Sequence, residues 1–132
     1  MKKSILPLLV LTLFIMSSCM QCSVSHTGGN FRRVDVAEFK EFITAPDVQL
    51  VDVRTAEEFN AGHIPGSINI DVLKGHEELV ATLDPERPVA LYCRSGRRSE
   101  NAAWVLEKVF FRNVVDLKGG YNAWVEYNAN LE

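Results

Sequence analysis

From Phe31 onward, short runs of apolar residues alternate with segments in which apolar residues recur every three or four positions. Runs rich in β-branched residues and bounded by turn residues predict strands, whereas the three-to-four spacing predicts helices. The expected strands are 31–34, 48–53, 67–70, 88–93 and 113–117. The expected helices are 35–43, 55–62, 75–83, 98–111 and 121–127.

This alternation predicts an α/β fold, with a central, mainly parallel sheet, helices on both faces and right-handed crossovers. The 132 residues, of which 47% are apolar and 23% charged, suit one globular domain. In parallel sheets the ligand site lies outside the carboxyl ends of the strands. Cys93 falls at one of these ends.

Residues at the ends and on the faces of the expected helices support these assignments. Asp35 is a candidate N-cap, and Thr55 and Glu58 have the spacing of a capping box. Trp104 and Trp124 are expected in the core. The longest helix should bury one face, formed by Ala102, Val105, Leu106 and Val109.

The first residues have the layout of a secretory signal peptide. Lys2 and Lys3 precede an apolar run over 5–16, and small residues and Cys19 follow it. The run of twelve residues is shorter than the roughly 20 that a membrane span needs. "MSSC" resembles a bacterial lipoprotein box, which predicts removal of 1–18 and lipidation of Cys19.

An alternative is cleavage by ordinary signal peptidase, to which "SVSH" at 23–26 is suited. Residues 19–30 are polar and contain glycine, which predicts a flexible tether to a domain over 31–132. The protein is therefore expected on the periplasmic side of a bacterial membrane as a lipoprotein, or free in the periplasm if Cys19 is not lipidated.

The charge and the cysteine count narrow the classes of partner. The chain has 14 basic and 17 acidic residues, and loss of Lys2 and Lys3 leaves 12 against 17, a formal charge of −5. This acidic balance disfavours a nucleic-acid partner. With Cys19 lipidated, Cys22 and Cys93 are too few for a disulfide framework, although a bridge between them in an oxidising periplasm stays open.

The stretch "CRSGRRS", residues 93–99, carries the candidate chemistry. Gly96 permits a tight turn whose N–H groups point inward, and the helix that follows adds unpaired N–H groups and its dipole. Cys93 would lie at their focus, with three arginines nearby, so its pKa should fall below about 8.5. A buried structural cysteine beside a solvated basic loop is the alternative interpretation.

Three motifs together resemble the rhodanese family: "VDVRTAEEFNAGHIPGSINI" at 51–70, "LYCRSGRRSENAA" at 91–103 and "LKGGYNAW" at 117–124. The resemblance implies a rhodanese-like fold with a five-stranded sheet and a sulfurtransferase that holds sulfane sulfur as a persulfide on Cys93. It also implies an active-site loop and supporting residues, namely Arg94, Ser95, Gly96, Arg97, Arg98, Ser99, Asp52, Gly119 and Gly120.

The supporting residues carry specific structural expectations. Asp52 is expected to fix Arg98 by a bidentate pair, because it lies at a strand end near the loop. Arg54 is expected to pair on the surface with one of the glutamates of the next helix. His63 is expected to be structural, since an already ionised thiol needs no separate base.

Phosphatases and arsenate reductases of the same fold resemble each other in a longer loop, with arginine six residues after the cysteine. Ser99 stands at that position here, which disfavours phosphate chemistry. The expected activity moves sulfur from an anionic donor such as thiosulfate to cyanide or a thiol, in a monomer without metal or organic cofactor. A membrane-tethered sulfur carrier or binding module with little turnover is the alternative.

Overall fold

The computed structural model describes residues 31–132 and contains a five-stranded sheet with the strand order β1-β5-β4-β2-β3. Every pair of neighbouring strands is parallel. The strands are β1 (Phe31–Val34), β2 (Gln49–Asp52), β3 (Ile68–Asn69), β4 (Val89–Tyr92) and β5 (Val114–Leu117). This confirms the predicted α/β class, and the sheet is wholly parallel in place of mainly parallel.

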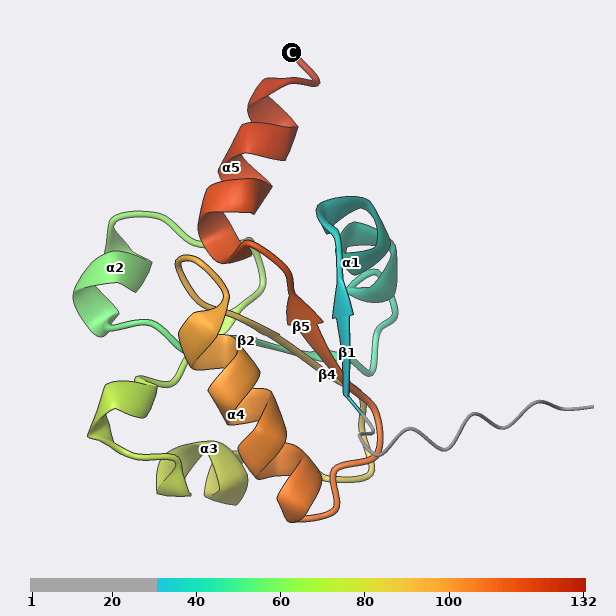
Figure 1. Ribbon diagram of the computed structural model, residues 1–132, viewed down its shortest axis with the longest axis vertical. Coiled ribbons are helices and arrows are strands. Elements are labelled where there is room, and N and C mark those ends of the chain that lie inside the picture. Colours follow the sequence, from blue (N-terminus) through green and yellow to red (C-terminus); the bar gives the residue numbers. More distant parts are fainter. Residues whose placement is uncertain (1–30) are drawn as a thin grey trace, which may run out of the picture.

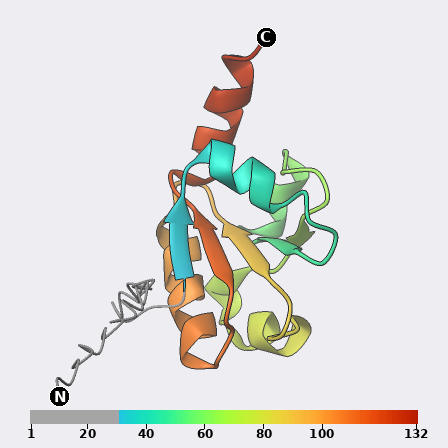
Figure 2. The ribbon, with the colours of Figure 1, turned by 90° about the vertical axis from the view of Figure 1, so that its right-hand side faces the viewer.

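Helices connect successive strands and cover both faces of the sheet (Figures 1 and 2). They are α1 (Val36–Phe42), α2 (Ala56–Asn60), the 3-10 turn η1 (Val72–Lys74), α3 (Glu77–Thr82), α4 (Arg97–Lys108) and α5 (Gly120–Ala129). Helices α3 and α4 pack on one core cluster, whereas α1 and α5 pack on the other. None of the helices between residues 31 and 132 is long and apolar enough to cross a membrane.

The predicted helix signals are present in the structure. The Asp35 side chain accepts a hydrogen bond from the Glu38 N–H at the start of α1. Thr55 and Glu58 form both hydrogen bonds of a capping box at the start of α2. These bonds satisfy N–H groups that a helix start otherwise leaves unpaired.

Helix α4 differs from the expectation at its buried face and its end. It ends at Lys108, so Val109 lies outside it and is exposed. Trp104 is also exposed and packs edge-on against Phe31 at the rim of the core, and Trp124 is half-buried. The buried positions are Ser99, Ala102, Ala103 and Leu106, mostly small residues that allow close approach to the sheet.

The carboxyl ends of three neighbouring strands define one edge of the sheet. Both β4 and β5 are buried along their whole length, and β4 pairs with β5 on one side and β2 on the other. Cys93 follows β4 directly, and Gly119 follows β5 after one intervening residue, Lys118. This is the edge where parallel sheets place their ligands.

Candidate active site

The loop between β4 and α4 wraps around the Cys93 sulfur. Cys93 is buried, with 1% of its surface exposed, and its thiol is free. Gly96 has φ 101°, a left-handed conformation that suits glycine, and its N–H donates to Cys93 Sγ at 3.1 Å. The Ser99 hydroxyl donates to the same sulfur at 3.5 Å. The predicted nest is thus built around the cysteine.

These donors change the acidity of the thiol. Burial raises the pKa of Cys93, because it disfavours the charged form. Hydrogen bonds from the Ser99 hydroxyl and from the N–H groups of Ser99, Gly96 and Ser95 outweigh burial, so that the pKa of Cys93 lies below its ordinary value. The alternative of an inert structural cysteine does not account for this concentration of donors.

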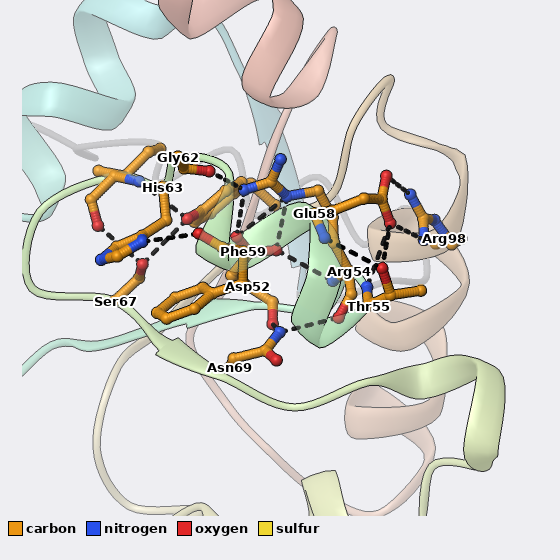
Figure 3. A network of polar contacts seen from close by, with 12 residues as sticks. Asp52, Arg54, Thr55, Glu58, Phe59, Gly62, His63, Ser67, Asn69 and Arg98 are labelled. Carbon is orange, nitrogen blue, oxygen red and sulfur yellow. Dashed lines mark hydrogen bonds and ion pairs between the residues drawn. The ribbon is translucent and has the colours of Figure 1, made fainter.

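Arg98 is held by Glu58, not by Asp52 as predicted (Figure 3). Its two terminal nitrogens donate to the two carboxylate oxygens of Glu58, each at 2.8 Å. This bidentate pair raises the pKa of Arg98, and the nearby Cys93 thiolate adds to the increase. Arg94 and Arg97 are exposed at the rim of the loop.

Asp52 forms a buried pair with Arg54, which the prediction had placed on the surface (Figure 3). Arg54 Nη2 lies 2.6 Å from Asp52 Oδ2 and also donates to the Gly62 carbonyl. Successive residues of a strand face opposite sides of a sheet, so that every second residue faces the same side. Asp52 therefore faces the α1 and α5 side with Leu50, away from Cys93, which explains the failed prediction.

The Asp52–Arg54 pair still reaches the loop through α5. The Arg54 guanidinium lies 4.3 Å from the centre of the Tyr121 ring, and the Tyr121 N–H donates to the Cys93 carbonyl at 2.7 Å. Arg54 is thus a buried support that orients the start of α5. His63 is exposed, and its ring stacks on Phe59 and contacts the Phe59 carbonyl, in keeping with a structural role.

Gly119 and Gly120 let α5 start directly against the Cys93 loop. In the first turn of α5, the Tyr121 and Asn122 N–H groups donate to the carbonyl oxygens of Cys93 and Arg94, respectively. Gly120 has φ 61°, and a Cβ there would collide with the backbone of both loop residues. Only glycine fits this close approach.

Gly120→Ala is therefore expected to displace the loop. Left-handed strain costs about 1–2 kcal/mol, and the collision adds about 1–3 kcal/mol, so both the Tm and the rate of Cys93 alkylation should fall. Gly66 is a matched control, because it has φ 85° but nothing within 4 Å of an added Cβ. Equal losses in Gly66→Ala and Gly120→Ala would contradict the close approach.

Glu58→Gln is expected to destabilise the domain in a pH-dependent manner. The hydrogen bonds from Arg98 lower the pKa of Glu58 from 4.5 to about 2. Because the folded-state pKa is the lower one, the stabilisation is present above pH 4.5 and is lost as the pH falls through about 2. Near neutral pH the variant should lose about 1–2 kcal/mol in urea unfolding.

The difference between Glu58→Gln and wild type should shrink as the pH falls from 4.5 towards 2. Glu57→Gln serves as the control, because Glu57 is exposed on the same helix and has no ion pair among residues 31–132. A pH-independent difference would show that the ion pair to Arg98 does not stabilise the fold.

Two residues near the loop were missed by the sequence reasoning. Asp116 is a buried carboxylate on β5, and Arg33 on β1 donates to it at 2.9 Å and to the Gly96 carbonyl at 3.3 Å. The signal was an acidic residue within the otherwise apolar run "VVDL". In the described range 31–132, no group of three or more His, Cys, Asp or Glu is placed to hold a metal ion.

Comparisons with known proteins show which family the chain resembles. Residues 35–127 match the family described as the rhodanese-like domain. Thiosulfate sulfurtransferase GlpE of Shewanella oneidensis is 35% identical over 100 residues, which cover 76% of this chain and 98% of that protein. The putative sulfur carrier protein YrkF of Bacillus subtilis is 30% identical over 101 residues, which cover 76% of this chain and 54% of YrkF.

A solved structure shows the same fold. The crystal structure of a rhodanese-related protein from Thermoplasma volcanium superposes with a TM-score of 0.65 at 31% identity, covering 73% of this chain and 92% of that chain. The family match spans both the Cys93 loop and the Gly119–Gly120 turn. The chain therefore belongs to the family of rhodanese-like domains, as its three sequence motifs predict.

Proposed function

We propose that this protein is a sulfurtransferase that carries sulfane sulfur as a persulfide on Cys93. The proposal rests on one observation above all: the buried Cys93 Sγ accepts hydrogen bonds from the Gly96 N–H at 3.1 Å and the Ser99 hydroxyl at 3.5 Å. A thiolate, not a thiol, is the nucleophile in sulfur chemistry. The donors stabilise that form, and they are equally suited to a persulfide anion.

The rim of the loop favours an anionic donor such as thiosulfate. A hollow in the surface is lined by Leu73, Arg94, Ser95, Arg97 and Arg98. Glu58 neutralises Arg98, whereas Arg94 and Arg97 have no ion pair among residues 31–132. Two uncompensated positive charges therefore border this hollow beside the Cys93 loop, where they would offset the charges of the donor.

The proposed reaction has two displacement steps. The Cys93 thiolate attacks the outer sulfur of thiosulfate, the donor's S–S bond breaks, and its electron pair leaves with sulfite. An acceptor such as cyanide then attacks the outer sulfur of the persulfide, and the Cys93 thiolate leaves as thiocyanate forms. This is a ping-pong sequence with a covalent intermediate. Cys93 is the nucleophile of the first step and the leaving group of the second, so it is a thiolate again when the cycle ends.

A sulfur carrier with little turnover is the second candidate, because YrkF, one of the relatives, is described as a putative sulfur carrier. A steady-state assay with thiosulfate and cyanide, beside a mass measurement of the protein, distinguishes the two. Ping-pong turnover supports the enzyme, and a stable persulfide with negligible turnover supports the carrier. If the protein shows no turnover and gains no sulfur mass, both candidate functions are contradicted.

We also propose that Cys19 anchors the protein to a membrane, on the sequence pattern alone. Cys19 and Cys22 lie outside the described residues. Lipidation that adds more than one acyl chain gives stable anchoring. Cys19→Ala should therefore block processing or release the domain from the membrane fraction, while Cys22→Ala should do neither. A cleaved Cys19→Ala protein that stays in the membrane fraction would rule out this anchor.

A further inference from the structure

Asp116 is a fully buried carboxylate with one oxygen left unpaired. It lies opposite Arg33 in the register of β1 and β5, which run side by side in Figure 2. Its Oδ2 accepts from Arg33 Nε at 2.9 Å, whereas its Oδ1 has no hydrogen-bond partner among residues 31–132. A buried oxygen without a partner is costly, so its presence calls for an explanation.

Arg33 fixes this carboxylate relative to the active-site loop. Besides Asp116, the guanidinium contacts the Gly96 carbonyl at 3.3 Å and a Glu100 oxygen at 3.1 Å. The Arg33 side chain thereby contacts β5, the Cys93 loop and α4 at once. Because Oδ2 of Asp116 is occupied by Arg33, only Oδ1 is available to another group.

Ser99 contacts the Cys93 sulfur and is buried in the first turn of α4, the helix that packs on β5, the strand of Asp116. Its hydroxyl is 3.5 Å from Cys93 Sγ, and it also lies close enough to Asp116 to lower the pKa of that carboxyl, although no hydrogen bond of regular geometry joins them. A hydroxyl has one proton to donate and lone pairs that accept. It can therefore pass a proton from one neighbour to the other.

We propose that Cys93, Ser99 and Asp116 form a proton relay, in which Asp116 receives the proton of the Cys93 thiol through the Ser99 hydroxyl. The Cys93 S–H bond breaks as its proton moves to Ser99 Oγ, and the Ser99 proton moves to Asp116 Oδ1. The products are a thiolate that accepts from Ser99 and a neutral carboxyl that donates to Ser99. No electron is transferred, and the unpaired Oδ1 gains a partner.

The acidities of the two end groups support such a transfer. Burial raises the pKa of Asp116 from 3.8 to about 6, against the opposing effects of Ser99 and Arg33. The loop donors bring the pKa of Cys93 below 9.0. The pKa of Asp116 is thus raised and that of Cys93 lowered, so the two pKa values lie closer together than in free residues. Closer pKa values favour proton transfer between the two groups.

The charged groups around Asp116 act in opposite directions. Arg33 on β1 lowers the pKa of Asp116, and Glu100 on α4 raises it. Cys93, beyond Ser99, is the remaining titratable neighbour on this path. Asp116 does not touch the sulfur, so it is a positioning residue that acts through Ser99. The inference rests on Cys93 as the nucleophile of the proposed function.

The test is the pH dependence of Cys93 alkylation by iodoacetamide in the full chain. Mass spectrometry of the peptide that carries Cys93 excludes any signal from Cys19 and Cys22. Wild type should show two steps in rate, the lower one near the Asp116 pKa of about 6. Asp116→Asn cannot accept a proton and should show one step, at a lower pH than the upper step of wild type.

Ser99→Ala keeps the Asp116 charge but breaks the path. It should also show a single step, at higher pH, and react roughly tenfold more slowly near pH 6. Glu100→Gln is the control, because it removes a nearby charge without touching the path, and it should keep both steps. If Asp116→Asn does not fold, the presence or absence of the lower step in Ser99→Ala decides whether the relay exists.

A single step in wild type would overturn the relay, as would a lower step that persists in Asp116→Asn or Ser99→Ala. Persistence in Ser99→Ala would mean that Asp116 acts on Cys93 through space. Alkylation reports on the thiol and needs no sulfur donor. Failure of the relay therefore leaves the proposed sulfur transfer intact, and failure of sulfur uptake leaves the relay intact.

Discussion

Cys93→Ser is expected to abolish sulfur transfer while the domain stays folded. Serine has nearly the same shape and can still accept from the Gly96 N–H. Its hydroxyl does not ionise near neutral pH and cannot hold sulfane sulfur as a persulfide, so loss of the nucleophile should reduce turnover by on the order of a thousandfold or more. Thiocyanate formation measures the activity, and circular dichroism measures the fold.

Cys22→Ser is the control for the loss of a thiol elsewhere in the chain. It should leave transfer intact, because the nest around the sulfur is built from residues 93–99. A Cys93→Ser protein that still takes up sulfur would refute the assignment of the nucleophile.

Asp52→Asn is expected to cause the largest loss of stability. Asp52 has no exposed surface and Arg54 only 3%, so the substitution leaves a buried guanidinium without its counterion. Breaking one partner of a buried pair costs about 3–5 kcal/mol of the free energy of unfolding. Urea unfolding at neutral pH measures this loss, and Asp47→Asn, at an exposed aspartate, should change little.

The double variant Asp52→Asn/Arg54→Met shows whether the loss of stability comes from the lost attraction or from leaving the Arg54 charge buried without a counterion. Removing both partners of a buried pair is less harmful than removing one, so the double variant should be more stable than Asp52→Asn alone. If the losses simply add, the buried pair does not behave as a coupled unit.

Much of the fold could be predicted because its signals are local. The capping residues Asp35 and Thr55, and the apolar runs that became β4 and β5, lie next to the structure they specify. The predicted strand 67–70 is shorter in the structure, where only Ile68–Asn69 pairs, because β3 is an edge strand with one neighbour. The turn η1 carried no periodic pattern and was missed.

The Cys93 loop could likewise be predicted, because its donors are neighbours in the sequence. The partners of the arginines could not, because each depends on which face of the sheet a side chain occupies. Asp52 and Cys93 both lie near the carboxyl edge of the sheet, but their side chains face opposite sides of it. Their nearness at the edge therefore suggested a contact that the sheet prevents. Arg33 and Asp116 are 83 residues apart and meet only through the register of β1 and β5.

The most direct test of the account is the mass of the Cys93 peptide after incubation of the protein with thiosulfate. We expect this peptide to gain the mass of one sulfur atom and to lose it again when cyanide is added, because the loop amides and Ser99 stabilise the anionic sulfur. An unchanged Cys93 peptide, or an added sulfur found only on another cysteine, would contradict the account.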